Sequence, residues 1–208
     1  MTQSKQARSG PGRPAGTDST DTRARVIEAA IQCFARYGYG PATNSQIAAE
    51  AGVTAGAVFY HFGTKRQLFE TVCADVYGRI IDNTHQHLTE PLSVRGLLRA
   101  LLESSMRINH QYPELAGFVA TAPIDARRYP ELSEPFSAVS ERMNEGLSDA
   151  VRLGQSAGLI PADLDPREVA RLVSAVVDGF AHAAAATDPI AMDRLTELFE
   201  TLLLESAR

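Results

Sequence analysis

Residues 43–65 read TNSQIAAEAGVTAGAVFYHFGTK, and this stretch decides the fold of the N-terminal part of the chain. Thr43 and Gln46 stand at the spacing of a capping box, in which each side chain bonds the backbone N–H of the other residue. We therefore predict that a helix begins directly after Thr43. Gly52 stands where this helix must end, because glycine adopts the left-handed conformation without a Cβ penalty. Thr54 then caps a second short helix. Two short helices joined by a tight turn predict a helix-turn-helix, whose second helix enters the DNA major groove.

The same stretch resembles the signature of a known family. Residues 47–65, IAAEAGVTAGAVFYHFGTK, resemble the helix-turn-helix of TetR-family transcriptional regulators, and the resemblance is strongest over residues 22–70. It implies a DNA-binding regulator, above all a repressor, that binds a palindromic operator as a homodimer and is released by a small, largely apolar effector. Phe59 departs from the pattern, because the family usually has tyrosine there and a phenyl ring cannot donate a hydrogen bond to a phosphate.

Other functions are compatible with the same pattern. The helix-turn-helix could belong to an activator or to a ligand-independent DNA-binding dimer. It could also be only a scaffold in an all-α enzyme or in a partner-binding protein. The sequence contains no glycine-rich phosphate loop, HExxH metal motif or nucleophile elbow. We therefore expect no enzymatic activity, no cofactor and no bound metal.

Charge is divided unevenly along the 208 residues. The whole chain has a net charge of −5, which by itself does not indicate nucleic acid. Residues 1–66 hold eight Lys and Arg against four Asp and Glu, whereas residues 67–208 hold 12 against 21. A basic unit on an acidic remainder is typical of a small DNA-binding domain joined to a domain that does not bind DNA. An unevenly charged solvated surface is the alternative.

Cysteine content and hydropathy bear on the compartment. Cys33 and Cys73 give no disulfide framework, and their place on apolar helical faces indicates core packing. No apolar run reaches the roughly 20 residues of a membrane span, and the polar N-terminus lacks the apolar core of a signal peptide. We therefore expect a cytoplasmic protein that does not enter a membrane. Asp82, His85 and His87 are residue types that bind metals, but histidines two positions apart face different sides of a helix, so they predict no metal site.

Three regions follow from composition and periodicity, and together they indicate an all-α fold. Residues 1–20 are rich in Gly, Pro, Ser and Thr and predict a flexible basic arm. Residues 21–66 form the predicted helix-turn-helix DNA-binding domain, and residues 67–208 form a helical effector-binding and dimerisation domain. A second capping box at Thr64 and Gln67 begins a long helix that links the two domains. In the family this helix moves the DNA-binding domain.

Further helices are expected in the C-terminal domain. Apolar residues at helical spacing predict one helix around residues 97–106 and another over residues 135–153. Between them we expect only a short segment up to Pro123 and a polar connection, IDARRYPELSEP. Proline at a first helical position starts the last two helices, at Pro166 and Pro189.

DNA contacts are assigned from the resemblance together with side-chain chemistry. At the start of the first short helix, hydroxyl, amide and backbone N–H donors point where a phosphate would lie. The start of the second helix faces the major groove, where small side chains permit close approach and methyl contacts. The candidates are Thr43, Asn44 and Ser45 for phosphate, Thr54, Ala55, Gly56 and Ala57 for bases, and Tyr60, His61 and Lys65 for phosphate. Arg13, within Gly12-Arg13-Pro14, either enters the minor groove or belongs to a solvated tail.

The C-terminal domain provides candidates for an effector cavity and a dimer interface. Methionines and aromatics at helical spacing, with polar groups among them, suggest ligand contacts, although plain core has the same pattern. These candidates are Met106, His110, Phe118, Arg127, Phe136, Met143, Phe180 and His182. The last two helices have more apolar surface than packing on one neighbour needs, which predicts dimerisation, with burial inside the monomer as the alternative. The dimer candidates are Val169, Val173, Val176, Val177, Phe180, Leu195, Leu198, Phe199 and Leu202.

Overall fold

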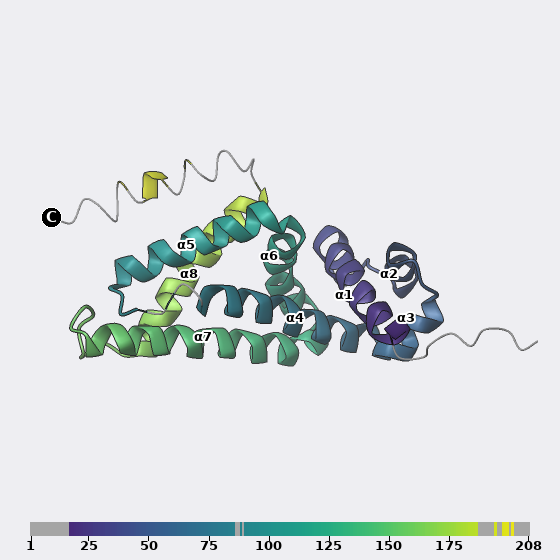
Figure 1. The fold of residues 1–208 in the computed structure, drawn as a ribbon, viewed down its shortest axis with the longest axis horizontal. Coiled ribbons are helices and arrows are strands. Elements are labelled where there is room, and N and C mark those ends of the chain that lie inside the picture. The colour runs from purple at the N-terminus through teal and green to yellow at the C-terminus, as the bar shows by residue number, and fades with distance from the viewer. Residues whose placement is uncertain are drawn as a thin grey trace, which may run out of the picture.

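The computed structural model describes residues 17–85, 88, 90–186, 194, 197–199 and 201. Within these residues the secondary structure is helical and there is no strand, so the all-α prediction is confirmed. A head of three helices, one long and two short, lies beside an elongated body (Figure 1). The head comprises α1 (Thr17–Tyr37), α2 (Asn44–Ala51) and α3 (Ala55–Phe62). The body comprises α4 (Lys65–His85), α5 (Val94–Gln111), α6 (Pro113–Arg128), the 3-10 helix η1 (Pro130–Leu132), α7 (Ser133–Ser156) and α8 (Pro166–Ala186).

Local signals determine where the short helices of the head begin and end. Thr43 caps α2, because its Oγ1 accepts the Gln46 N–H at 3.2 Å and Gln46 Oε1 accepts the Thr43 N–H at 2.9 Å. Gly52 ends α2 in the left-handed conformation, with φ 63° and ψ 38°, where another residue would carry a Cβ penalty. Thr54 Oγ1 accepts the Ala57 N–H at 3.2 Å and begins α3. The predicted helix-turn-helix is confirmed.

The long helix α4 connects the head to the body. Thr64 Oγ1 accepts the Gln67 N–H at 3.2 Å, and Gln67 Oε1 accepts the Thr64 N–H at 3.0 Å, as the second capping box predicts. From this cap α4 runs beside α7, while α5 and α8 cover the far half of the body (Figure 1). α6 packs along α1 and so forms a second connection between the body and the head.

The first helix begins earlier than composition predicts. It starts at Thr17, within the residues that composition assigns to the flexible arm. Gly16 is the last glycine or proline of that stretch, so α1 begins directly after the last helix-breaking residue. Asp21 and Arg25 pair across one helical turn at 3.7 Å, and such pairs stabilise helices.

The connection predicted between residues 113 and 135 is wrong. α6 passes through Pro123 and continues into the segment that was assigned to a polar connection. Proline removes one backbone hydrogen bond and costs about 3 kcal/mol inside a helix. The helix continues because Ala122, Asp125 and Ala126 are buried against neighbouring elements. Tertiary packing here outweighs the local preference.

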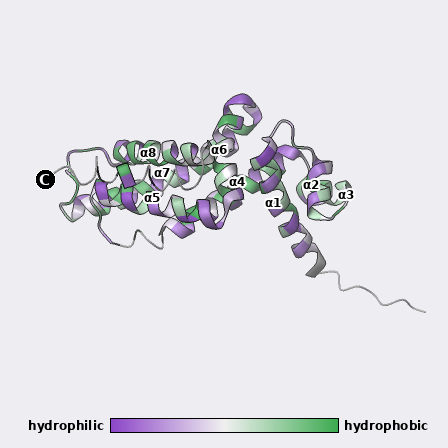
Figure 2. Cartoon of the chain, turned by 90° about the horizontal axis from the view of Figure 1, so that it is seen from above, coloured by the Kyte–Doolittle hydropathy of each residue, from purple (hydrophilic) through white to green (hydrophobic). Residues whose placement is uncertain are grey.

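Two hydrophobic clusters stabilise the fold. The first joins head and body: the Phe69 ring of α4 lies 5.3 Å from that of Phe34 in α1 and 5.5 Å from that of Phe118 in α6, between centroids. The second cluster lies far from the head and combines apolar residues of α5, α7 and α8 with Ile160. Figure 2 shows apolar and polar residues alternating along the helices of the body, the pattern of helices that each have an apolar side. In the described part of the chain, no helix is both long and apolar enough to cross a membrane.

Candidate DNA interface and ligand cavity

The outward side of α3 is the candidate DNA interface. Val58 and Phe62 are buried in the core of the head, so the opposite side of this short helix faces away from the protein. The outward residues are Ala55, Gly56, Phe59 and Tyr60, which we call the reading face. The reading face exposes two aromatic rings to solvent, since Phe59 is 66% exposed and Tyr60 is 83% exposed. Ala57, which was predicted to contact bases, is half-buried.

The N-terminus of α2 lies on the outer surface of the head. Ser45 is exposed and Asn44 is half-buried there, so both stay predicted phosphate contacts. The hydroxyl groups of Thr43 and Thr54 accept backbone N–H groups of their own helices. These two threonines therefore have a capping role in addition to the DNA contact predicted for them.

His61 lies between two aromatic rings at the end of α3. It is half-buried, and its ring centroid is 5.3 Å from that of Tyr60 and 6.2 Å from that of Phe62. The imidazole therefore has a packing role, and its contact with phosphate stays a prediction. Arg13 lies outside the described residues.

The structure places Lys65 differently from the prediction. Its Nζ donates hydrogen bonds to the carbonyl oxygens of Tyr39, Gly40 and Ala42 at 2.9, 3.1 and 3.0 Å. It also lies 4.4 Å from the centroid of the Tyr39 ring. Burial lowers the pKa of this ammonium group, and the nearby Glu131 acts in the opposite direction. An ammonium has three N–H donors, all of which are used here, so Lys65 holds the segment between α1 and α2 and is not a free phosphate contact.

Arg25 has a structural role that sequence reasoning missed. Its Nη2 donates to the carbonyl oxygens of Ala51 at 2.5 Å and Gly52 at 3.1 Å. It thereby satisfies carbonyl groups at the end of α2, which a helix leaves unpaired. No local signal could have found this contact, because Arg25 stands on α1 and its partners lie 26 and 27 residues later.

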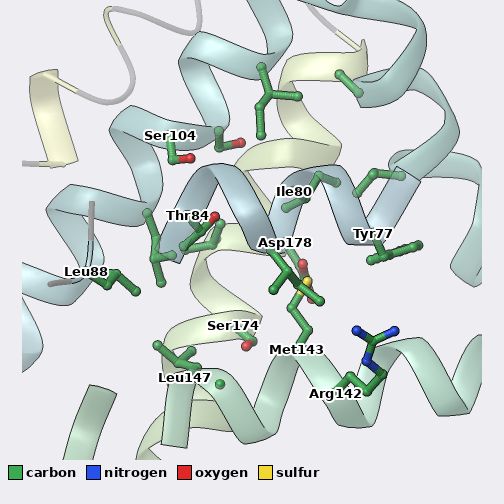
Figure 3. A pocket seen from close by; sticks show the side chains of 18 of the residues that line it. Tyr77, Ile80, Thr84, Leu88, Ser104, Arg142, Met143, Leu147, Ser174 and Asp178 are labelled. Atoms are coloured by element: carbon green, nitrogen blue, oxygen red, sulfur yellow. The ribbon is translucent and has the colours of Figure 1, made fainter. Parts of the chain in front are cut away.

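A cavity of about 130 Å³ lies inside the body and is enclosed by α4, α5, α6, α7 and α8 (Figure 3). Aliphatic side chains form most of its wall, among them Ile80 and Ile81 of α4, Leu101 of α5, Val119 of α6 and Leu147 of α7. A mostly apolar wall with a few polar groups is typical of small-molecule sites. The cavity lies in the C-terminal domain, where the sequence predicts one.

Most of the predicted ligand residues do not line this cavity. Of the candidates only Met143 does, whereas Met106, His110, Phe118, Arg127, Phe136, Phe180 and His182 do not. Phe118 is fully buried in the aromatic cluster, and Phe136 packs edge-on against Tyr77 at 6.0 Å between centroids. His110, Arg127 and His182 are on exposed sides of their helices. Residue type alone could not identify the lining, because the rotation of each helix decides which side faces the cavity.

Polar groups of the cavity were not among the predicted contacts. Ser104 Oγ donates to Asn83 Oδ1 at 3.1 Å, and Ser174 Oγ donates to Asn144 Oδ1 at 3.3 Å. Asp178 lies one turn after Ser174 and also lines the cavity (Figure 3), although the residue as a whole is exposed. The surrounding helices still desolvate its carboxyl group, which raises the pKa of Asp178. Small polar residues on otherwise apolar helical faces were the signal available in the sequence.

The structure corrects part of the predicted dimer interface. Val169 and Val173 are buried in the second hydrophobic cluster of the monomer, and Val177 lines the cavity. The exposed side of α8 is instead formed by Leu172, which is 63% exposed, together with Ala175, Gly179 and His182.

The remaining dimer candidates lie on α8 or beyond it. Val176 is half-buried at the edge of the exposed side. Phe180 packs edge-on against Phe199 with 5.0 Å between ring centroids, and Leu198 is exposed. Leu195 and Leu202 lie outside the described residues.

Asp125 joins the body to the head. Its Oδ2 accepts the Tyr39 N–H at 2.7 Å, and the residue is only 6% exposed. Tyr129, one turn later, packs edge-on against Tyr39 with 5.2 Å between ring centroids. α6 also approaches α1 closely at Gly117, where a Cβ would lie 3.2 Å from Cβ of Ala35. The end of α1 is therefore held directly by α6.

Comparison with known proteins agrees with this arrangement. Residues 26–72 match the family of bacterial regulatory proteins, tetR family, and residues 94–206 match the BetI-type transcriptional repressor, C-terminal. The HTH-type transcriptional repressor AcnR of Corynebacterium glutamicum is 28% identical over 171 residues, which cover 80% of this chain and 83% of AcnR.

Solved structures have the same fold. Salmonella enterica GusR superimposes with a TM-score of 0.69 at 25% identity, covering 91% of this chain and 99% of GusR. FadR of Bacillus subtilis, solved in complex with stearoyl-CoA, superimposes with a TM-score of 0.70 at 20% identity, covering 84% of this chain and 96% of FadR. Because the family matches cover both head and body, the chain belongs to the TetR family and is a DNA-binding transcriptional regulator.

Proposed function

We propose that this chain is a repressor that binds a palindromic operator as a homodimer, and that a small, largely apolar effector in the body cavity releases it. The observation that carries the proposal is that two helices, α4 and α6, both line the cavity and pack against the head. α4 contributes Ile80 to the cavity and Phe69 to the contact with Phe34 of α1. α6 contributes Val119 to the cavity and Phe118 to the same aromatic cluster. A ligand that favours a different spacing of α4 and α6 shifts the population toward a different position of the head.

The reading face supports contact with the major groove. Ala55 and Gly56 have little or no side chain, so the backbone of α3 can approach base edges closely. Ser45 and Asn44, at the start of α2, stand where helix N-termini of such motifs bind phosphate. Tyr60 projects a hydroxyl group from the same surface. One recognition helix contacts only a few base pairs, so two heads roughly 34 Å apart are needed to read a palindrome.

The size and lining of the cavity indicate the size and polarity of the proposed effector. A volume of about 130 Å³ is close to that of an engineered apolar cavity of ~150 Å³ that binds benzene. Drug-sized ligands occupy roughly 300–1,000 Å³, so a larger effector requires the helices to move apart. Structures of regulators with this fold include ligand complexes, as the stearoyl-CoA complex of FadR illustrates. Ser174 and Asp178 on one side of α8 are placed to orient a polar group of the ligand.

Filling the cavity tests the proposed release. Ala116 lines the cavity from α6, and Ala116→Leu should occupy part of the small volume while leaving the head unchanged. A compound screen on the native protein identifies molecules that raise its melting temperature and weaken operator binding. We expect Ala116→Leu to bind the operator with native affinity and to lose at least tenfold in response to those compounds, measured by fluorescence anisotropy with titrated compound.

A matched control is Ala138→Leu, because Ala138 is exposed on α7. This variant should respond to the same compounds as the native protein does. An equal response in both variants would place the effector elsewhere. If the native protein binds no duplex DNA in a sequence-dependent way, the repressor proposal itself is wrong.

The exposed side of α8 supports dimerisation. We expect Leu172→Glu to place a charge in the proposed interface and to shift the protein to monomers, because a buried unpaired charge is strongly unfavourable. Sedimentation velocity at micromolar concentration measures the change, and affinity for a full palindrome should fall by at least tenfold. Ile124→Glu is the control, since Ile124 is an exposed apolar residue on a different helix, α6. Unchanged dimers in Leu172→Glu would move the interface to another face.

A further inference from the structure

Phe59 is an exposed aromatic residue on α3, whose other outward residues include the small Ala55 and Gly56. The side chain is 66% exposed, whereas Val58 and Phe62 on the other side of α3 are buried. Among the described residues, its ring neither packs against another aromatic ring nor lies beside a cation, whereas the ring of His61 nearby packs against Tyr60 and Phe62. The protein itself therefore gives this ring no packing role.

Phe59 is the largest purely apolar side chain of the reading face. Ala55 and Gly56 stand one turn before it on the same side of α3. A Cβ built on Gly56 would meet only Thr54 Oγ1, at 3.8 Å, so the space beside the ring is open. Helical side chains lean toward the N-terminus of their helix. The phenyl ring is thus directed over the part of α3 that enters the major groove.

The chemistry of the ring restricts what it can contact there. A phenyl group has no hydrogen-bond donor, so it cannot bind a phosphate oxygen as a tyrosine at this position would. On the major-groove edges of the bases, the thymine C5-methyl is the apolar group that a phenylalanine contacts. We propose that Phe59 is a specificity-determining residue that reads a thymine methyl in each operator half-site. This inference rests on the operator binding proposed above.

The experiment separates the methyl group from the rest of the base. Duplexes selected by the native protein from a random pool define the half-site, and each thymine is then replaced singly by uracil, which lacks only the methyl. We expect uracil at one or two positions to weaken binding of the native protein about fivefold. In Phe59→Ala the same replacements should change the dissociation constant less than about twofold, because the methyl has lost its partner.

Two further variants keep the result interpretable. We call the loss of affinity caused by replacing thymine with uracil the uracil penalty. Phe59→Tyr retains the ring and should keep this penalty. Tyr60→Phe removes only an exposed hydroxyl and should weaken binding to all sequences while leaving the uracil penalty intact. Circular dichroism and thermal unfolding verify that each head is folded, which is expected because the substituted side chains are exposed.

Distinct outcomes separate this inference from the proposed function. A uracil penalty that is the same in the native protein and Phe59→Ala, or that is absent from the native protein, overturns the role of Phe59 while operator binding stands. Failure of the selection to enrich any sequence overturns operator binding itself. A penalty that disappears only in Phe59→Ala establishes methyl recognition by this residue.

Discussion

Lys65→Met should lower the melting temperature of the protein by about 6–12 °C, measured by differential scanning calorimetry. The native Nζ donates to three carbonyl oxygens, those of Tyr39, Gly40 and Ala42, in the segment that connects α1 to α2. Hydrogen bonds to a charged group contribute more than neutral ones, and carbonyls left without a partner add a desolvation cost. We expect a loss of about 3 kcal/mol in the free energy of unfolding. For a chain of this size, each kcal/mol of lost stability lowers the melting temperature by about 2–4 °C, which gives the expected decrease of about 6–12 °C.

The salt dependence of DNA binding distinguishes this role from a phosphate contact. Each phosphate that a lysine neutralises contributes a slope of about −0.9 in a plot of log K against log salt concentration. Because the Lys65 ammonium is occupied by carbonyl oxygens, we expect Lys65→Met to leave this slope unchanged at temperatures where the head is folded. A slope reduced by about one unit would restore the phosphate contact that the sequence predicts.

Arg36→Met is the matched control for Lys65→Met. It removes the same charge from the head and introduces the same residue, but Arg36 is exposed in the last turn of α1. Arg36 interacts with the helix dipole, with Tyr37 and with the nearby Glu50, and such interactions of an exposed side chain are weak. We expect its melting temperature to fall by no more than about 3 °C. Equal losses in the two variants would mean that charge, and not the carbonyl contacts, accounts for the effect.

The elements that could be predicted from the sequence are those whose ends are determined by residues close to one another in the sequence. The capping boxes at Thr43 and Thr64 join residues three positions apart, so their spacing is visible in the sequence and the structure contains both. Gly52 is similar, since the need for a left-handed residue at the end of a short helix is local. The two short helices and the turn between them were therefore predicted from the sequence.

The remaining features depend on contacts between distant residues. Lys65 comes within reach of the carbonyl groups after α1 only once the helices of the head have packed together. Its position in the sequence therefore suggested an ordinary basic surface residue. The continuation of α6 through Pro123 depends on burial that only the folded body supplies. Polar cavity residues such as Thr84 and Ser174 stand on otherwise apolar helical sides, but this signal could not place them in one cavity, because helical spacing indicates a buried side and not which neighbour it faces.

Asp125→Ala should uncouple the unfolding of the head from that of the body. The native carboxylate accepts the Tyr39 N–H at 2.7 Å across 86 residues of sequence and is almost fully buried. Alanine leaves that N–H buried without its acceptor, at a cost of about 1–3 kcal/mol. Since Asp125 belongs to α6 and Tyr39 follows α1, the loss falls on the junction itself. We expect calorimetry to change from one transition in the native protein to two in the variant.

The same substitution should weaken communication between cavity and operator. A compound that stabilises the native protein and releases it from DNA should still raise the melting temperature of the body in Asp125→Ala, because the cavity wall is unchanged. Its effect on operator affinity should fall by about five- to tenfold, since coupling energies between sites are typically 1–3 kcal/mol and part of this energy passes through the junction. Fluorescence anisotropy with and without the compound measures this ratio.

Two comparisons decide whether Asp125 acts through its hydrogen bond. Asp125→Asn keeps a carbonyl acceptor in the same place, so it should retain most of the coupling, whereas a role for the negative charge predicts a loss as large as in Asp125→Ala. Asp149→Ala removes an exposed carboxylate that pairs with Arg152 on the same helix, and it should leave both the single transition and the response to the compound intact. If Asp125→Ala and Asp149→Ala respond alike, α4 alone transmits the signal, and the contact between α6 and Tyr39 only stabilises the fold.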